Sequence, residues 1–302
     1  PGQAVELARA VEATGCLRLE GLWTHLAVAD EPGDRFTAGQ LRCFEAVRAR
    51  RRAAGMSPPL VHAANSAGAM AHPAARYDLV RCGIAVYGYL PAPGMEGELR
   101  PVLSLRARVS MVRELEAGER PSYGRRRPLP GRAWVATVPL GYADGVPRRL
   151  LDGGMVALVR GQRRPLAGAV TMDQIVLDCG PEPDVAVGDE VVLLGGQGEE
   201  RVTADDWARA LGTISYEVLC GVGPRVPRVP VRGGRPVGAR LPFVTGPPVG
   251  SRGSEPPVPP PPGPGPGPAP PVPPVPPLPG PGPGPGPAPP VPPVPPLPGP
   301  GE

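Results

Sequence analysis

A tyrosine in a glycine-rich turn is the residue of this sequence best suited to move a proton. Tyr142 follows an apolar run over residues 136–140 and lies inside Gly-Tyr-Ala-Asp-Gly, residues 141–145. The run predicts a strand and the glycines predict a sharp bend, so we expect the phenol at the rim of a strand. A phenol has an ordinary pKa of about 10 and acts as a base near neutral pH only beside cations or hydrogen-bond donors. Other parts of the chain must supply those neighbours.

The elements that must carry such neighbours alternate between helices and strands over the first ninety residues. Apolar spacing and turn signals predict helices over residues 3–14, from an N-cap at Thr37 to about Gly55, and briefly after residue 65, and strands over residues 17–27, 60–64 and 77–88. This alternation favours a parallel sheet with right-handed crossovers.

Candidate functional residues lie at the carboxyl ends of the three predicted strands. They are His25 on the first strand, Asn65 and Ser66 after the second, and Arg81, Gly83 and Ile84 on the third. Functional groups of parallel α/β barrels lie at these strand ends. Because three strands do not close a barrel, we expect the last three βα units of a TIM-type (β/α)8 barrel whose first strands are absent.

A second rhythm begins at about residue 100, after a linker at residues 91–94. Short apolar or alternating runs between Gly, Pro and Asp turns predict a mainly antiparallel β-domain with runs over residues 102–115, 134–140, 155–160, 165–178 and 190–194. Thr203, followed by two acidic residues, predicts the start of one helix that ends at Gly212. The predicted domains are therefore residues 1–93, 94–232 and 233–302.

The last of these parts is a loop that continues into a Pro/Gly-rich repeat. A thirteen-residue unit at residues 267–279 recurs at residues 286–298. Proline fixes φ and removes backbone donors, so we predict an extended or disordered tail. Its PxxP segments could bind an aromatic groove of a partner, while an inert spacer or a read-through artefact explains them equally well.

Composition excludes several classes of protein. All 32 basic residues are Arg, 28 acidic residues nearly balance them, and no basic stripe is interleaved with aromatics, which argues against nucleic-acid binding. No apolar run approaches the length of about 20 residues that a membrane span needs. The five cysteines lack metal-ligand spacing, so we expect reduced thiols in a cytoplasmic chain and no metal.

Six motifs in order resemble those of the alanine racemases. They are Trp-Thr-His-Leu-Ala-Val-Ala-Asp (23–30), Ala-Asn-Ser-Ala-Gly (64–68), Val-Arg-Cys-Gly-Ile-Ala-Val-Tyr-Gly (80–88), Gly-Tyr-Ala-Asp-Gly (141–145), Val-Thr-Met-Asp-Gln (170–174) and Ile-Ser-Tyr-Glu-Val (214–218). The resemblance implies a barrel that binds pyridoxal 5′-phosphate, followed by a β-domain. It also implies a head-to-tail homodimer with shared active sites that interconverts L- and D-alanine, the latter for peptidoglycan.

The resemblance also implies roles for individual residues. Tyr142 matches the tyrosine that exchanges the α-proton on the L-alanine face and reaches in from the partner subunit. Arg81 matches the arginine facing the pyridine nitrogen of the cofactor, and His25 matches a histidine that relays hydrogen bonds between these two. Phosphate-binding groups are matched by Ser66, Gly83, Ile84 and Tyr216. The backbone amide of Met172, with Asp173 beside it, matches the contact to the substrate carboxylate.

One departure from the family pattern concerns the second base. The family uses a Schiff-base lysine at the end of the first barrel strand, and this sequence contains no Lys. Two bases on opposite faces of a planar carbanion are needed, because a single base returns the proton to the face it left. We therefore expect the lysine before Pro1 and expect residues 1–302 alone to be inactive.

Each assignment has a structural alternative. His25 could be a core histidine, Asn65 and Ser66 a helix cap, and Arg81 an ion-pair partner of Asp78, while Tyr216 and Met172 could be core residues. His62 and His72 are expected to be structural, and Tyr123 receives no role. For the whole protein the alternatives are a racemase of other specificity, a barrel decarboxylase, which Arg81 argues against, or a non-catalytic protein that docks partners through its tail.

Overall fold

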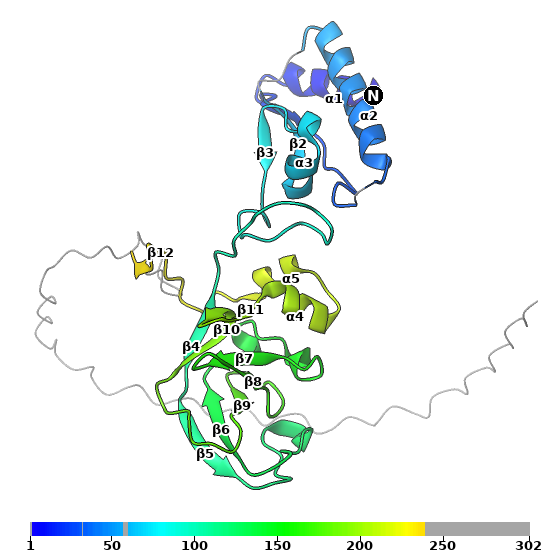
Figure 1. Ribbon diagram of the computed structural model, residues 1–302. Helices are drawn as coiled ribbons and strands as arrows, with labels where there is room; N and C mark the ends of the chain where they lie inside the picture. Colours follow the sequence, from blue (N-terminus) through cyan, green and yellow to red (C-terminus); the bar gives the residue numbers. More distant parts are fainter. Residues whose placement is uncertain (1, 32, 57–59, 239–302) are drawn as a thin grey trace, which may run out of the picture. The chain divides into compact units, whose positions relative to one another are not determined.

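A computed structural model describes residues 2–31, 33–56 and 60–238 (Figure 1). The chain divides into two compact units, Pro1–Ser251 and Arg252–Glu302, and all of the described residues belong to the first. The predictions for the Pro/Gly-rich repeat fall outside the described residues. The domain divisions expected at residues 93 and 232 stay predictions.

The first part of the chain forms a three-stranded parallel sheet with helices between its strands, as the alternating pattern predicts (Figure 1). Its elements are α1 (Gly2–Ala13), β1 (Gly21–Trp23), α2 (Phe36–Ala53), β2 (Leu60–Asn65), α3 (Ser66–Ala71), the 3-10 turn η1 (Pro73–Ala75) and β3 (Leu79–Arg81). The strand order is β1-β2-β3, so β2 is central and its carboxyl end lies between those of the other two. A small core under the sheet includes Leu26, Phe44 and Ala63.

Three details of this part differ from the sequence predictions. The run over residues 17–27 is a strand only at Gly21–Trp23, because β2 pairs with it over just those three residues. The third strand ends at Arg81, and the chain then turns to Gly88, whose φ of +83° favours glycine. Thr37 is not an N-cap: α2 begins at Phe36, and Thr37 is buried inside the helix.

The rest of the described chain is mainly antiparallel, as predicted. Its strands are β4 (Leu105–Arg108), β5 (Met111–Leu115), β6 (Ala133–Val138), β7 (Val156–Val159), β8 (Gln162–Pro165), β9 (Ile175–Asp178), β10 (Glu190–Gln197), β11 (Glu200–Val202), β12 (Val231–Arg232) and β13 (Arg235–Pro236). One sheet has the order β11-β10-β7-β8 with β4 on β10, and another has the order β5-β6-β9. The run over residues 165–178 is therefore two strand ends separated by a loop, and that loop carries Met172 and Asp173.

Short helical turns and two helices connect these strands. The turns are η2 (Tyr123–Arg125), η3 (Tyr142–Asp144) and η4 (Arg148–Leu151), and the helices are α4 (Ala204–Leu211) and α5 (Ser215–Gly221). The predicted cap is confirmed: the Thr203 hydroxyl accepts from the Asp206 amide at 3.1 Å, and the Asp206 carboxylate accepts from the Thr203 amide at 2.8 Å. No described helix is long and apolar enough to cross a membrane.

Candidate active site

The guanidinium of Arg81 joins the carboxyl ends of all three parallel strands. Its Nη2 donates to the carbonyl oxygens of Ala63 at 3.0 Å and Thr24 at 3.2 Å, and lies 3.3 Å from Nδ1 of His25. Its Nη1 lies 2.6 Å from Nδ1 of His62. Because a guanidinium only donates, the lone pair of each imidazole must face it. One side chain therefore fixes the positions of two imidazoles.

Arg81 is not paired with Asp78, so the ion-pair alternative is wrong. The Asp78 carboxylate instead accepts from the amide of Val61 at 2.7 Å. Within the described residues no carboxylate forms a salt bridge with Arg81. Only neutral acceptors meet the guanidinium, so its charge stays available to a neighbouring group.

The sequence reasoning missed His62 as a neighbour of Arg81. Burial, and then the charge of Arg81, lower the pKa of His62, so its imidazole is neutral and can accept. Its ring lies parallel to Trp23, with centroids 6.0 Å apart, and the Arg81 guanidinium lies 5.3 Å from the centre of the Trp23 ring. The available signal was its place on the central strand, between the strand that precedes His25 and the strand that carries Arg81.

His25 is exposed, so the core-histidine alternative is also wrong. The backbone around it is held from α2 by Gln40, whose side-chain nitrogen donates to the His25 carbonyl and to the Thr24 hydroxyl. The side-chain oxygen of Gln40 accepts from the Ala27 amide at 3.1 Å. One half-buried amide thus makes three contacts across the turn that carries His25.

Three of the four predicted phosphate-binding residues lie together beyond β2 and β3. The buried hydroxyl of Ser66 accepts from the amides of Gly83 at 3.1 Å and Ala85 at 3.4 Å. Gly83 is exposed and has open space where a side chain would be, and the Ile84 amide has no hydrogen-bond acceptor in the described part of the chain. Asn65 caps α3, so a cap and a cluster of donors coexist here. Such donors suit an anionic group.

The fourth residue, Tyr216, lies on α5 and is 38% exposed, so it is not a core residue. Burial, and then the charge of Asp30, raise the pKa of Tyr216. The phenol is therefore protonated and able to donate at neutral pH. It lines a cavity of about 470 Å³ together with the linker residues from Leu90 to Pro93.

The turn that carries Tyr142 is held by its backbone. The amides of Tyr142 and Ala143 donate to the carbonyl oxygens of Thr171 and Met172, each at 3.0 Å. A Cβ placed on Gly141 would lie 2.3 Å from the Met172 oxygen, so only glycine permits this approach. The phenol itself is 45% exposed, beyond the end of β6, as the sequence predicts.

The other side of the turn is closed by Asp144 and Gly145. Asp144 is buried, and its Oδ2 accepts from the Gly141 amide at 2.9 Å. Gly145 has φ of +105°, and a Cβ there would lie 2.3 Å from the Gly221 carbonyl oxygen. Beside this turn is a cavity of about 390 Å³, lined by Tyr142 and by residues of α5.

Met172 and Asp173 lie in the loop against this turn. Met172 is 53% exposed, so the alternative that it is a core residue is wrong. Asp173 accepts from Arg225 at 2.8 Å. Within the described residues no hydrogen bond joins Tyr142 to His25 or Arg81. That these neighbours meet Tyr142 across two subunits stays a prediction.

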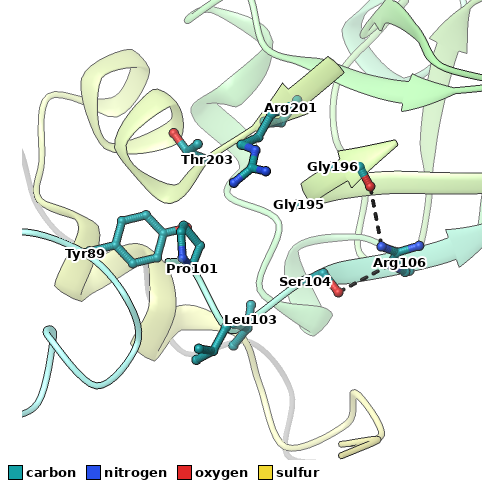
Figure 2. A pocket seen from close by; sticks show the side chains of 11 residues that line it. Tyr89, Pro101, Leu103, Ser104, Arg106, Gly195, Gly196, Arg201 and Thr203 are labelled. Atoms are coloured by element: carbon teal, nitrogen blue, oxygen red, sulfur yellow. Dashed lines mark hydrogen bonds between the residues drawn. The ribbon is translucent and has the colours of Figure 1, made fainter. Parts of the chain in front are cut away.

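A separate cavity of about 220 Å³ lies where the chain enters the β-domain (Figure 2). Its wall includes Tyr89, whose hydroxyl accepts from the Ala204 amide at 3.2 Å. None of the predicted site residues lines this cavity, so we assign it no part in the site. Within the described chain, no group of three or more His, Cys, Asp or Glu side chains could hold a metal ion.

Comparison with known proteins adds independent evidence. Residues 1–91 match the model of the alanine racemase N-terminal domain, and residues 102–230 match that of the alanine racemase C-terminal domain. The chain is 49% identical over 230 residues to an alanine racemase of Symbiobacterium thermophilum, covering 76% of this chain and 61% of that protein. The chain therefore spans about three fifths of the length of this curated relative.

Solved structures of alanine racemases align with this chain over most of its length. An alanine racemase of Clostridium difficile 630 in complex with cycloserine aligns with a TM-score of 0.75 and 34% identity, covering 81% of this chain and 64% of that one. An alanine racemase of Bacillus anthracis with bound L-Ala-P aligns with a TM-score of 0.71 and 35% identity, covering 77% and 60%. Both the parallel and the antiparallel parts thus have counterparts of known structure.

Proposed function

The chain belongs to the alanine racemase family, and from that premise we propose that the protein it contributes to interconverts L- and D-alanine with pyridoxal 5′-phosphate. One relative of known structure has bound L-Ala-P, which supports an alanine-sized substrate. D-alanine made in this way would serve peptidoglycan synthesis. Because the chain spans three fifths of its curated relative, the activity is proposed for the whole protein.

The observation that carries this proposal is the carboxylate-free setting of Arg81. When bound, pyridoxal 5′-phosphate supplies an electron sink for the negative charge left when the α-proton departs. Arg81 would face its pyridine nitrogen, and a guanidinium, which holds its proton tightly, cannot readily protonate that nitrogen. The neutral contacts of Arg81 keep this charge directed outward, which limits the sink and so discourages side reactions.

The same part of the chain fits the phosphate of the cofactor. The Ser66 hydroxyl and the Ile84 amide offer donors beyond β2 and β3, and the Gly83 amide, which here donates to the Ser66 hydroxyl, would have to exchange that acceptor for phosphate. The Tyr216 phenol, with its raised pKa, would add a further donor. A hydroxyl, backbone amides and a phenol match the oxygens of a phosphate group.

Proton transfer falls to Tyr142. We propose that its phenol exchanges the α-proton on the L-alanine face, and that His25 and Arg81 of the partner subunit connect to it through a hydrogen-bond relay. The Met172 amide, with Asp173 beside it, would bind the substrate carboxylate. The site would then be completed only in a homodimer.

Residues 1–302 hold no lysine and therefore lack the second base. We propose that this chain alone does not racemise alanine. To test the site, the part of the Symbiobacterium thermophilum relative that precedes the matched region can be joined to residues 1–238. This chimera should bind the cofactor and convert L- to D-alanine. Circular dichroism of the alanine measures that conversion over time.

Tyr142→Phe in the chimera should lower the rate from L-alanine by at least about a hundredfold, the usual size of a positioned proton-transfer group. Tyr123→Phe alters another exposed tyrosine in a turn and is the matched control. Racemisation by residues 1–302 alone with added cofactor would contradict the two-base proposal. An unaffected Tyr142→Phe chimera would remove Tyr142 from the mechanism.

A further inference from the structure

We propose that Arg225 is a positioning residue that clamps the turn carrying Tyr142 to the loop carrying Met172. Its Nη2 donates to Oδ1 of Asp173 at 2.8 Å, and its Nε lies 3.4 Å from Oδ1 of Asp144. Asp144 ends the turn that begins with Tyr142, and Asp173 follows Met172 directly. The consequence for catalysis rests on the function proposed above, whereas the clamp itself does not.

The two carboxylate oxygens of Asp144 have different partners. Oδ2 accepts from the Gly141 amide at 2.9 Å and closes the turn from within, which leaves Oδ1 for Arg225. The Asp144 side chain is 10% exposed, so this carboxylate has little water with which to replace a lost partner. Arg225 thus supplies the cation for a nearly buried anion.

Backbone hydrogen bonds bring the same three segments together. Gly223 lies two residues before Arg225, and its amide donates to the Asp144 carbonyl at 3.1 Å. The amides of Tyr142 and Ala143 donate to carbonyl oxygens of the loop that carries Met172. Among the described residues, Arg225 is the one side chain that forms salt bridges with both Asp144 and Asp173. Without it, two carboxylates near one another would lose the cation they share and repel each other.

The chemistry of an arginine suits this position. The hydrogen bond to Asp173, and then the charge of Asp144, raise the pKa of Arg225, so it is charged at every working pH. Its nitrogens form a rigid fork that serves two carboxylates at once, whereas a lysine presents a single point charge. Arg225→Lys is therefore the informative conservative variant, because it keeps the charge and loses the fork.

Amide hydrogen exchange in the chain of 302 residues tests the clamp without any need for activity. In Arg225→Met, the Tyr142 and Ala143 amides should exchange about fivefold faster, the upper range for loss of a partly exposed charge pair. The Ala136 and Val192 amides of β6 and β10 should be unchanged, which reports that the fold is intact. Arg232→Met, an exposed arginine on β12, is the matched control and should change none of these rates.

Two further variants keep the test decisive if Arg225→Met destabilises the whole domain. Asp173→Asn removes only the exposed half of the clamp and should speed the same two amides by a smaller factor, and Arg225→Lys should fall between the wild-type chain and Arg225→Met. Unchanged Tyr142 and Ala143 exchange in Asp173→Asn and in a folded Arg225 variant would overturn the clamp.

The chimera then reports the catalytic consequence. Arg225→Met should lower kcat from L-alanine more than it raises KM, with partial rescue in Arg225→Lys, because a displaced phenol impairs proton transfer more than binding. An inactive chimera with wild-type residues would count against the proposed function and leave the exchange result standing. An active chimera whose kcat is insensitive to Arg225→Met would overturn the positioning role.

Discussion

The surroundings of Arg81 and of Tyr142 are fixed in two different ways. Around Arg81, side chains hold the structure in place, because the strands β1 and β3 are only three residues long. The guanidinium and His62 bridge the strand ends, and Gln40 holds the turn that carries His25. Around Tyr142, the backbone holds the turn in place. Its amides donate to the loop that carries Met172, and its glycines allow the close approach of the two segments. Charge also differs, since neutral acceptors meet Arg81 while two carboxylates meet Arg225.

This contrast follows from what each site must hold. A guanidinium whose charge is to act on a neighbouring ring must be oriented without being neutralised, and carbonyl oxygens and neutral imidazoles do that. A phenol that exchanges a proton must be placed within a fraction of an ångström, and a backbone turn is stiffer than a long side chain. We therefore expect the turn of Tyr142 to be sensitive to changes that displace its backbone, and the region of Arg81 to be sensitive to loss of side-chain contacts.

The largest effect is expected at Gly141. In Gly141→Ala the new Cβ would lie 2.3 Å from the Met172 oxygen, so the turn must move away from the loop. We expect a loss of about 1–3 kcal/mol in the free energy of unfolding, the usual cost of overpacking, measured by urea denaturation. Gly131→Ala is the control, because open space surrounds that position. Equal stability of the two variants would show that the turn is not fixed by its backbone.

A smaller effect is expected at Gln40. Gln40→Leu removes all three contacts around His25 and leaves the Ala27 amide and the His25 carbonyl to water. Because this side chain is half-buried, we expect a loss of about 1 kcal/mol, and a changed chemical shift for the His25 ring by NMR. Arg42→Leu alters an exposed residue of the same helix and should change neither. If the two variants have the same stability and the same His25 chemical shift, the Gln40 side chain does not hold His25 in position.

Sequence reasoning reached most local features, with the N-cap at Thr37 as an exception, and missed the long-range ones. The Thr203 cap, the alternation of helices and strands and the turn at Tyr142 each depend on neighbouring residues. Strand length in β1 depends on where β2 pairs with it, and the clamp at Arg225 joins carboxylates 52 or more residues away in the chain. Periodicity carries no information on such contacts. His62 was missed because its role appears only when three strands are placed side by side.

The smallest effect, and the most specific to the Arg81 region, is on the titration of His62. Burial and the charge of Arg81 hold the pKa of His62 below its ordinary 6.5. The imidazole therefore binds a proton more readily in the unfolded chain than in the folded one. The stability that this group contributes is present above pH 6.5 and is lost as the pH falls below that value. Arg81→Met should raise the pKa of His62 only in part, because burial is the larger cause. NMR can follow this directly, since the chain has three histidines. His72 is the internal reference. A His62 pKa that does not respond to Arg81→Met would show that the guanidinium charge is screened at the strand ends, and the contrast with the carboxylate-bound Arg225 would then disappear.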